Sequence, residues 1–209
     1  MALYHSRALD KNIIQVRPEI QLVPTVESDF TAVASWFINH KKTASNSGCK
    51  KREKASKIYE SPLISDAVAI RQWAGPSVTF PCSIDSLGLF IKKGFSTSFV
   101  LKYDEVTLGF GQLQLLKHKA HLARLVINPE YRGRGLGKHL LSELIQQADK
   151  QVRFEQISSK HASLKQVSLF VNIENFVAIA CYQKFGFAES VMPVGISVPA
   201  DCRYMTLHF

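Results

Sequence analysis

The pattern of hydrophobic and polar positions in the first third of the chain predicts one strand and one helix. Residues 19–24, EIQLVP, alternate apolar and polar side chains, which is typical of a short strand. Residues 30–40, FTAVASWFINH, predict a helix, and Ser28 or Asp29 would cap its N-terminus. The segment 61–81 has no clear period, so we assign no element to it.

After residue 82 the hydrophobic pattern becomes easier to interpret. Ser83 can cap a helix over residues 84–93, IDSLGLFIKK. Three strand-like segments follow, and the turn at Asp104-Glu105 makes the first two a hairpin. We expect these strands over residues 97–103, 106–116 and 119–128.

The last third of the chain alternates helices and strands. Apolar residues recur at helical spacing over 134–149 and form one apolar face. A short buried strand is expected over 166–172, and a helix over 175–186 ends at Gly186, a typical C-cap. Two closing strands are expected over 187–192 and 202–209. This order of elements predicts an α/β fold with a mixed sheet in a single domain.

The charge of the chain leaves several classes of partner open. Lys and Arg number 26 against 17 Asp and Glu, which gives a net charge of +9. Such a balance suits nucleic acid, an anionic membrane surface or a polyanionic small ligand. Residues 41–57 hold seven basic residues and one acid, but no aromatic residues for base stacking. We therefore expect a solvated loop there and disfavour a nucleic-acid partner.

Cysteine spacing and hydropathy indicate the compartment of the protein and bear on metal and membrane binding. The four cysteines are scattered without a CxxC pair, which favours reduced thiols over a disulfide framework or a zinc site. No apolar run has the length of a membrane span, and residues 1–12 lack the apolar core of a secretory signal. We therefore expect a cytoplasmic protein with no bound metal and no membrane partner.

Residues 128–137, NPEYRGRGLG, place three glycines between a predicted strand and a predicted helix. Glycine weakens both kinds of element, so another role is expected for it here. The N-terminus of a helix offers unpaired N–H groups and a partial positive charge, and glycines let an anion approach the backbone. The segment has neither the GxxxxGK[ST] motif nor the spacing of a dinucleotide motif. It predicts a site for a phosphate-bearing ligand.

Two motifs resemble those of the GCN5-related N-acetyltransferase (GNAT) superfamily. Residues 132–137, RGRGLG, match its Q/R-x-x-G-x-G/A motif. Residues 175–187 match its second motif, N-x-x-A-x-x-x-Y-x-K-x-G-F, in the family's order along the chain. The resemblance covers residues 19–209, preceded by an N-terminal extension of residues 1–18. It implies the family's fold, a mixed, mostly antiparallel sheet flanked by helices in one domain.

The resemblance also implies acetyl-CoA as the co-substrate. The backbone of residues 125–127 would pair with the pantetheine arm, and the amides of residues 133–138 would hold the pyrophosphate. For the side chain of Lys138, an ordinary surface position is an equal alternative. The acyl-CoA ligands implied in this way are Leu125, Val126, Ile127, Arg132, Gly133, Arg134, Gly135, Leu136, Gly137, Lys138 and Asn175.

By the same resemblance, Tyr182 would be the catalytic acid that protonates the leaving thiolate. Tyrosine suits this role because it stays protonated at neutral pH and donates a hydrogen bond. The alternative is a half-buried aromatic side chain that packs its helix against the sheet.

The catalytic base is less directly indicated by the resemblance. Many relatives carry a glutamate on the strand at 166–172, where this chain has Phe170. His121 is the candidate instead. It lies on the strand that leads into the glycine turn, where some relatives place a glutamate and the arylalkylamine acetyltransferases a histidine. A histidine of ordinary pKa can accept a proton near pH 7. A structural histidine, with ordered water as the base, is the alternative.

Two further side chains raise questions of placement. Strict alternation along residues 119–128 would put His121 and Leu125 on one face of the sheet and Arg124 on the other. An arginine in a central strand needs a partner, and we expect a structural role with a carboxylate from a covering helix. Trp73 either lines the acceptor pocket or packs in the core.

The sequence therefore predicts an enzyme that transfers acetyl from acetyl-CoA to a primary amine by direct attack in a ternary complex. The alternative is a non-catalytic acyl-CoA sensor, which the replacement of the family's glutamate by Phe170 allows. The acceptor is expected to be a small molecule or a peptide, and the protein a monomer or homodimer.

Overall fold

A computed structural model of the chain provides the coordinates. The structure describes residues 19–37, 67–75, 78, 82–92, 96–116, 118–155, 163–195 and 200–209. The expected N-terminal extension 1–18 and the basic segment 41–57 lie outside the described residues.

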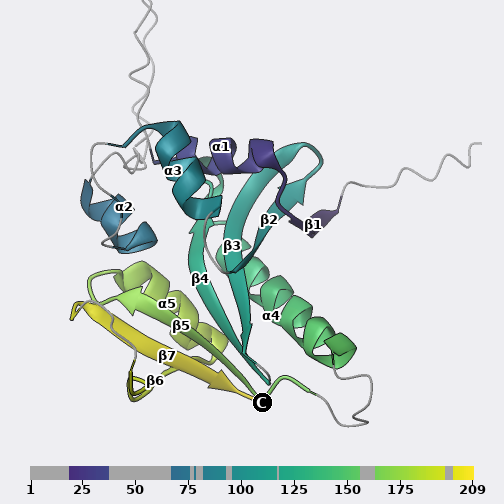
Figure 1. Cartoon of the computed structure of the whole chain (residues 1–209), viewed down its shortest axis with the longest axis vertical. Helices are drawn as coiled ribbons and strands as arrows, with labels where there is room; N and C mark the ends of the chain where they lie inside the picture. The colour runs from purple at the N-terminus through teal and green to yellow at the C-terminus, as the bar shows by residue number, and fades with distance from the viewer. Residues whose placement is uncertain are drawn as a thin grey trace, which may run out of the picture.

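A seven-stranded sheet forms the centre of the molecule, in the order β1-β2-β3-β4-β5-β7-β6 (Figure 1). Neighbouring strands are antiparallel except for β4 and β5, which run parallel. The strands are β1 (Ile20–Pro24), β2 (Thr97–Tyr103), β3 (Val106–Leu116), β4 (Lys119–Ile127), β5 (Gln166–Asn172), β6 (Ala188–Glu189) and β7 (Cys202–His208). The expected mixed, mostly antiparallel α/β fold in a single domain is confirmed, although the strand expected over 187–192 shortens to β6.

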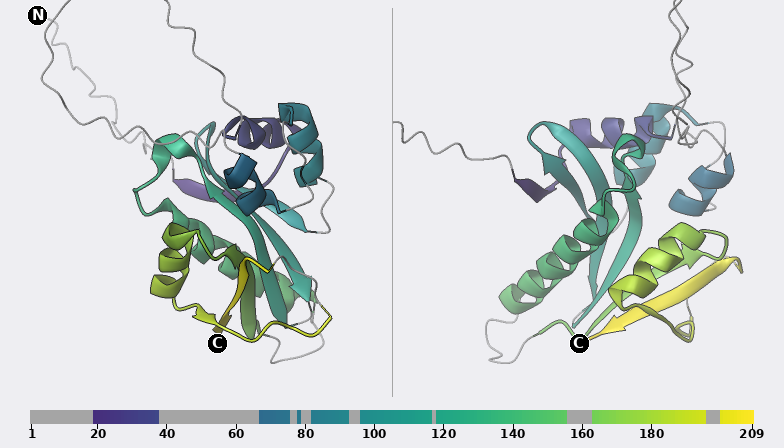
Figure 2. Two further views of the ribbon diagram at one scale, coloured as in Figure 1. Left: turned by 90° about the vertical axis from the view of Figure 1, so that its left-hand side faces the viewer. Right: turned by 180° about the vertical axis from the view of Figure 1, so that it is seen from behind.

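Helices cover both faces of the sheet and bury a core on each side (Figure 2). On one face α4 and α5 pack over β3, β4 and β5. On the other face α1, α2 and α3 enclose a second core with Phe110 of β3 and Val126 of β4. The helices are α1 (Glu27–Ser35), α2 (Ala67–Ala74), α3 (Ile84–Lys92), the 3-10 turn η1 (Pro129–Tyr131), α4 (Leu136–Glu155) and α5 (Phe176–Phe185).

Most predicted helices are found, with three changes. The helix expected over 30–40 is α1, which spans Glu27–Ser35 and so begins and ends earlier. Helix α2 lies in the segment that has no clear sequence period, and α4 begins at Leu136, after the glycine turn. Ser83 does cap α3, because its hydroxyl accepts a hydrogen bond from the Ser86 N–H at 3.1 Å. None of the helices in the described ranges combines the length and hydrophobicity that a membrane span needs.

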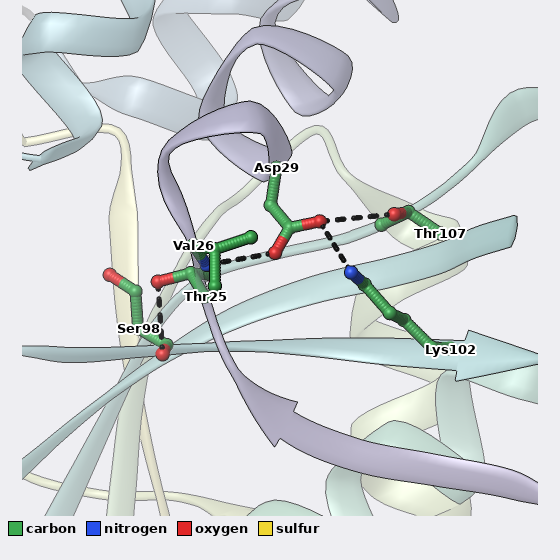
Figure 3. A network of polar contacts seen from close by, with 6 residues as sticks. All are labelled: Thr25, Val26, Asp29, Ser98, Lys102 and Thr107. Atoms are coloured by element: carbon green, nitrogen blue, oxygen red, sulfur yellow. Dashed lines mark hydrogen bonds and ion pairs between the residues drawn. The ribbon is translucent and has the colours of Figure 1, made fainter. Parts of the chain in front are cut away.

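Asp29 ties the start of α1 to the sheet (Figure 3). The helix begins at Glu27, with Val26 as its N-cap, so the prediction of Ser28 or Asp29 as the cap is wrong. Asp29 is instead the third helical residue, and its carboxylate reaches back to accept a hydrogen bond from the Val26 N–H at 2.9 Å. The same carboxylate pairs with Lys102 of β2 at 3.0 Å. A buried acid therefore links the start of α1 to β2.

Strand β4 contains a β-bulge at Arg124, whose φ is 51°. Gln112 of β3 pairs with Ala123, and Phe110 of β3 pairs with Val126. Two residues of β4 therefore stand opposite one residue of β3, which is the definition of a bulge.

The bulge changes which side chains of β4 share a face. Ala120 and Leu122 belong to the core beneath α4, and Leu125 packs against that same core. His121, which lies between Ala120 and Leu122, therefore faces the other side. The expectation that His121 and Leu125 share a face is wrong, because it assumed an alternation that the bulge interrupts.

Strands β4 and β5 pair along only part of their length. Their parallel register joins residues 119–122 to residues 166–169. Beyond these pairs, β4 continues to Ile127 and β5 to Asn172, and the two strands diverge (Figure 1). The divergence leaves one edge of β4 without a strand partner in the middle of the sheet.

Candidate active site

A pocket of about 760 Å³ lies where β4 and β5 diverge. Its walls come from the end of β4, the glycine turn, the first turn of α4, the end of β5 and one side of α5. Of the acyl-CoA ligands and catalytic residues predicted from sequence, those that line it are Leu125, Val126, Ile127, Arg132, Gly133, Gly135, Leu136, Gly137, Lys138, Asn175 and Tyr182. We call it the β4–β5 pocket.

The glycine turn owes its composition to its backbone conformation. Gly133 has a φ of 76° and Gly135 a φ of 79°, in the left-handed region that favours glycine. A Cβ built on either glycine would meet no atom of the described chain within 4 Å. The space beside the turn is therefore open for a ligand to approach the backbone.

The turn leads directly into α4, a helix of 20 residues. The first N–H groups of a helix have no partner within it, and they carry the positive end of its dipole. These groups face the same pocket that Gly135 and Gly137 line. The arrangement is suited to binding a phosphate-like anion.

The basic residues of the turn occupy different positions. Arg132 is tied to the end of β4, because its Nε donates a hydrogen bond to the Ile127 carbonyl at 3.1 Å. The guanidinium of Arg134 lies over the Tyr131 ring, 5.2 Å from its centre, and Arg134 does not line the β4–β5 pocket. Lys138 does line the pocket and is the cation of this group on the first turn of α4.

Tyr182 lies on α5 at the edge of the core and lines the β4–β5 pocket. Its side chain is 9% exposed and its ring lies 6.0 Å from that of Phe187. Burial raises the pKa of its hydroxyl, so the group stays protonated at neutral pH. Both the packing role and the proton-donor role predicted for this tyrosine are compatible with this position.

Asn175 also has a structural role at the start of α5. Its side-chain oxygen accepts a hydrogen bond from the Ala178 N–H at 3.2 Å, which makes it the N-cap of the helix. At the other end, Gly186 has a φ of 114° and closes α5 as the predicted C-cap. Asn175 therefore lines the pocket and at the same time orients the helix that carries Tyr182.

A second pocket, of about 580 Å³, lies next to the first, beside residues 121–124 of β4. It is formed by α2, β4, the end of β5 and the start of β7. His121 lines this pocket and not the β4–β5 pocket. We call it the His121 pocket. The two pockets share the wall residues Gln72, Trp73, Arg124, Phe170 and Asn172.

His121 is held by a hydrogen bond across β4 and β5. Its Nδ1 lies 3.0 Å from the Ser168 hydroxyl oxygen. Ser168 donates its one hydroxyl proton to the Ala120 carbonyl at 3.3 Å. The serine oxygen therefore accepts the Nδ1–H, and the lone pair of the imidazole is on Nε2. Burial lowers the pKa of His121 to about 4, so this ring is neutral at pH 7.

Aromatic rings flank the histidine and the neighbouring wall. The centre of the Phe170 ring lies 5.0 Å from that of His121. Trp73 stacks on Phe37, with ring centres 4.2 Å apart, and also lines both pockets. Packing in the core and lining a pocket are thus both true of Trp73.

Three side chains of the site were not predicted as functional, namely Arg124, Gln112 and Ser168. Arg124 donates a hydrogen bond to the Gln112 side-chain oxygen rather than to the expected carboxylate. Ser168 contacts His121 from the neighbouring strand. For two of them the sequence held a signal, a polar residue inside an apolar strand. These are Ser168 in QVSLFVN and Gln112 in VTLGFGQLQLL. Neither strand reveals by itself which partner the polar residue will meet.

The site can now be compared with known proteins. A sequence profile of the acetyltransferase (GNAT) family matches residues 67–187, more than half of the chain. A spermidine N(1)-acetyltransferase of Thermoplasma acidophilum is 34% identical over 84 residues, which are 40% of this chain and 45% of that protein. The chain thus matches less than half of the length of that curated relative.

Solved structures share the fold over nearly the whole chain. The ribosomal-protein-S18-alanine N-acetyltransferase of Escherichia coli is 19% identical with a TM-score of 0.51, covering 91% of this chain and 94% of that one. The spermidine N-acetyltransferase of Vibrio cholerae, in complex with CoA and spermine, is 16% identical with a TM-score of 0.55, covering 90% and 95%. The glycine turn, the diverging strands and the family profile agree, and the chain belongs to the acetyltransferase (GNAT) family.

Proposed function

We propose that this protein transfers an acetyl group from acetyl-CoA to a primary amine, by direct attack while both substrates are bound. The observation that carries the proposal is the β4–β5 pocket, which has an anion-binding helix start at one end and Tyr182 in its wall. The catalytic domain comprises residues 19–209, because the described elements from β1 to β7 belong to one sheet. The family and its structural relatives support an enzyme over an acyl-CoA sensor.

The residues of the β4–β5 pocket fit an extended ligand that ends in phosphates. The backbone edge of Leu125, Val126 and Ile127 would pair with the amides of a pantetheine arm, in the place that β5 would take if it did not diverge from β4. The amides at the start of α4 would hold the pyrophosphate. A Cβ at Gly135 would enter the open space that this ligand needs. GNAT enzymes use acetyl-CoA, which has this shape.

The reaction forms one bond and breaks one bond. The amine nitrogen attacks the thioester carbonyl carbon, the C–S bond breaks, and the products are the acetylamide and free CoA thiol. Holding the two reactants in line removes much of the entropic barrier, so no covalent enzyme intermediate is needed. The departing thiolate needs a proton, and the hydroxyl of Tyr182 can supply it.

The proton lost by the amine goes to His121 or to water beside it. With Nδ1–H bonded to Ser168, the free Nε2 is the proton acceptor on the ring. A pKa of about 4 makes the ring neutral across the working range but only weakly basic. We therefore assign to His121 the role of passing the proton from the amine to solvent water, and not the role of retaining it.

The test is release of CoA thiol from acetyl-CoA by the full chain, followed with a thiol reagent over a panel of amines. We expect thiol release that depends on an amine and yields the acetylamide in equal amount, detected by mass spectrometry. Binding of acetyl-CoA without amine-dependent thiol release would favour the sensor. Absence of binding would refute the assignment of the β4–β5 pocket.

A further inference from the structure

Arg124 lies at the place where the two pockets meet. It lines both of them, and it is the bulged residue of β4, with a φ of 51°. A positive φ is uncommon and unfavourable for a side chain of this size. The bulge turns this residue toward the shared wall, between the side that would hold the thioester and the side that contains His121.

The guanidinium of Arg124 is held in a fixed orientation. One of its nitrogens, Nη1, donates to the Gln112 side-chain oxygen, and its Cζ lies 4.8 Å from the centre of the Phe90 ring. Gln112 is itself fully buried and donates to the Ile91 carbonyl at 3.0 Å and to the Ser98 hydroxyl at 2.8 Å. An arginine that is anchored in this way loses little further entropy when it binds a ligand.

Most of the donor capacity of Arg124 is unused within the described part of the chain. The guanidinium has five N–H groups, and the hydrogen bond to Gln112 uses one of them. No carboxylate of the described residues forms an ion pair with it, and its Nε is buried without a hydrogen-bond partner among them. A planar anion that reached Nη2 would satisfy this charge.

The charges around the His121 pocket favour an anion over a second cation. Its cationic wall residues are Arg124 and Arg71, and His121 is neutral at pH 7. The one carboxylate that the described residues contribute is Asp201, which accepts a hydrogen bond from the Asn172 side chain at 2.9 Å. A polyamine carries several positive charges and would be repelled by these two arginines.

We propose that the acceptor is an amine that also carries a carboxylate, and that Arg124 binds this carboxylate. The proposal rests on the proposed acetyl transfer and specifies its substrate class. The rings of Trp73 and Phe170 line the same pocket, so the remainder of the acceptor is expected to be apolar. Amino acids with apolar side chains have this chemistry. Their amine lies within two bonds of the carboxylate, which places it at the junction of the pockets.

The test uses pairs of acceptors that differ only in the carboxylate, such as phenylalanine with 2-phenylethylamine and leucine with 3-methylbutylamine. In the wild-type protein, we expect the amino acid to have a kcat/KM about 10- to 100-fold above that of the amine, as expected for a charge-assisted pair. Equal or reversed values in every pair would refute the substrate class, while acetylation of the amines would still support the proposed function. If no acceptor released thiol, the proposed function itself would fail.

In the Arg124→Gln variant, kcat/KM should fall about 10- to 100-fold more on the amino acid than on the simple amine, so that the preference for the carboxylate is lost. Lys150→Gln removes the same charge from the exposed side of α4 and should keep the preference. An equal loss on both members of each pair in Arg124→Gln would assign Arg124 to the thioester or to the fold, and would refute the proposal. Should this variant fail to fold, inhibition of the wild type by 3-phenylpropionate replaces it. Inhibition competitive with the amine is expected, and none at concentrations well above those of the amine would count against the anion site.

Discussion

The two pockets beside β4 are built from different parts of the chain. The β4–β5 pocket presents backbone at both ends, from the strand edge at Leu125–Ile127 to the glycine turn. The His121 pocket presents side chains from four separate elements, among them Trp73 and Arg124. A backbone site depends on local conformation, whereas a side-chain site depends on which residues the fold brings together. The first is therefore visible as a motif, and the second is not.

The largest effect is expected from a substitution in the β4–β5 pocket. Gly135→Val should abolish the rise in melting temperature that acetyl-CoA produces in the wild type, a rise expected when a ligand binds only the native state. The branched side chain would fill open space beside the turn and force a positive φ that valine avoids.

The strain of that substitution needs its own control. Gly195 also has a positive φ, of 84°, has no neighbour that a Cβ would meet, and lines neither pocket. Gly195→Val should lower the melting temperature of the free protein to a similar extent and keep the full response to acetyl-CoA. An unchanged response in Gly135→Val would remove the glycine turn from the binding site.

Tyr182→Phe tests whether a side chain takes part in catalysis in the β4–β5 pocket. The ring and its contact with Phe187 remain, and only the hydroxyl is lost. Turnover should fall by about 10²- to 10⁴-fold, the usual effect of a lost general acid, while acetyl-CoA binding stays near the wild-type value. Single-turnover thiol release and the thermal response would measure the two quantities.

Loss of binding in Tyr182→Phe would indicate that its main role is packing, because the defect would lie in the ground state. Unchanged turnover would mean that the thiolate leaves without this proton. Either result would remove Tyr182 as the general acid.

His121→Gln tests the side-chain pocket. Activity should fall at neutral pH, by roughly tenfold to a hundredfold, and the loss should shrink at high pH, where more of the acceptor amine is already neutral. Because burial lowers the pKa of His121 to about 4, its ring gains a proton only well below pH 6. The decline of wild-type activity between pH 8 and 6 should therefore follow the amine, and it should persist in the variant. A wild-type inflection near pH 6.5 that the variant lacks would contradict this account.

Local patterns predicted the framework of this fold, and tertiary contacts decided the rest. The strands and α4 follow from periodicity because one face of each must be buried. The bulge at Arg124 could not be predicted, because it depends on the opposite strand. A Cβ at Gly111 of β3 would lie 2.7 Å from Leu144 of α4 and 2.8 Å from Leu125 of β4. The side chains of these two leucines therefore pack closely against the backbone of β3 there. The residues of α2 lacked a clear period, and its Trp73 became part of the site only through the fold.

The same distinction applies to the candidate site. The glycine turn and the helix after it are contiguous in sequence, so their geometry was predictable apart from the exact start of α4. His121 and Ser168 are 47 residues apart, and only the parallel register of β4 and β5 brings them into contact. Gln112 and Arg124 meet across an antiparallel pair whose register the bulge shifts. Partners of this kind follow from topology and not from any local pattern.

The smallest expected effect concerns Ser168, which we infer to be a positioning residue. Ser168→Ala removes the acceptor of the Nδ1–H of His121, so the ring can rotate or change tautomer and Nε2 is no longer fixed toward the pocket. Turnover should fall by about three- to tenfold, less than in His121→Gln, because the imidazole remains. Ser168→Thr keeps the hydroxyl and should recover most of the activity.

A double-mutant cycle separates positioning from simple packing. If Ser168 acts only through His121, adding Ser168→Ala to His121→Gln should cause no further loss of turnover. Independent roles would instead multiply the two losses. The pH profile gives a second readout, since the loss in Ser168→Ala should also shrink at high pH if it arises from a misplaced proton acceptor. A pH-independent loss that multiplies with that of His121→Gln would mean that Ser168 supports the sheet and not the proton relay.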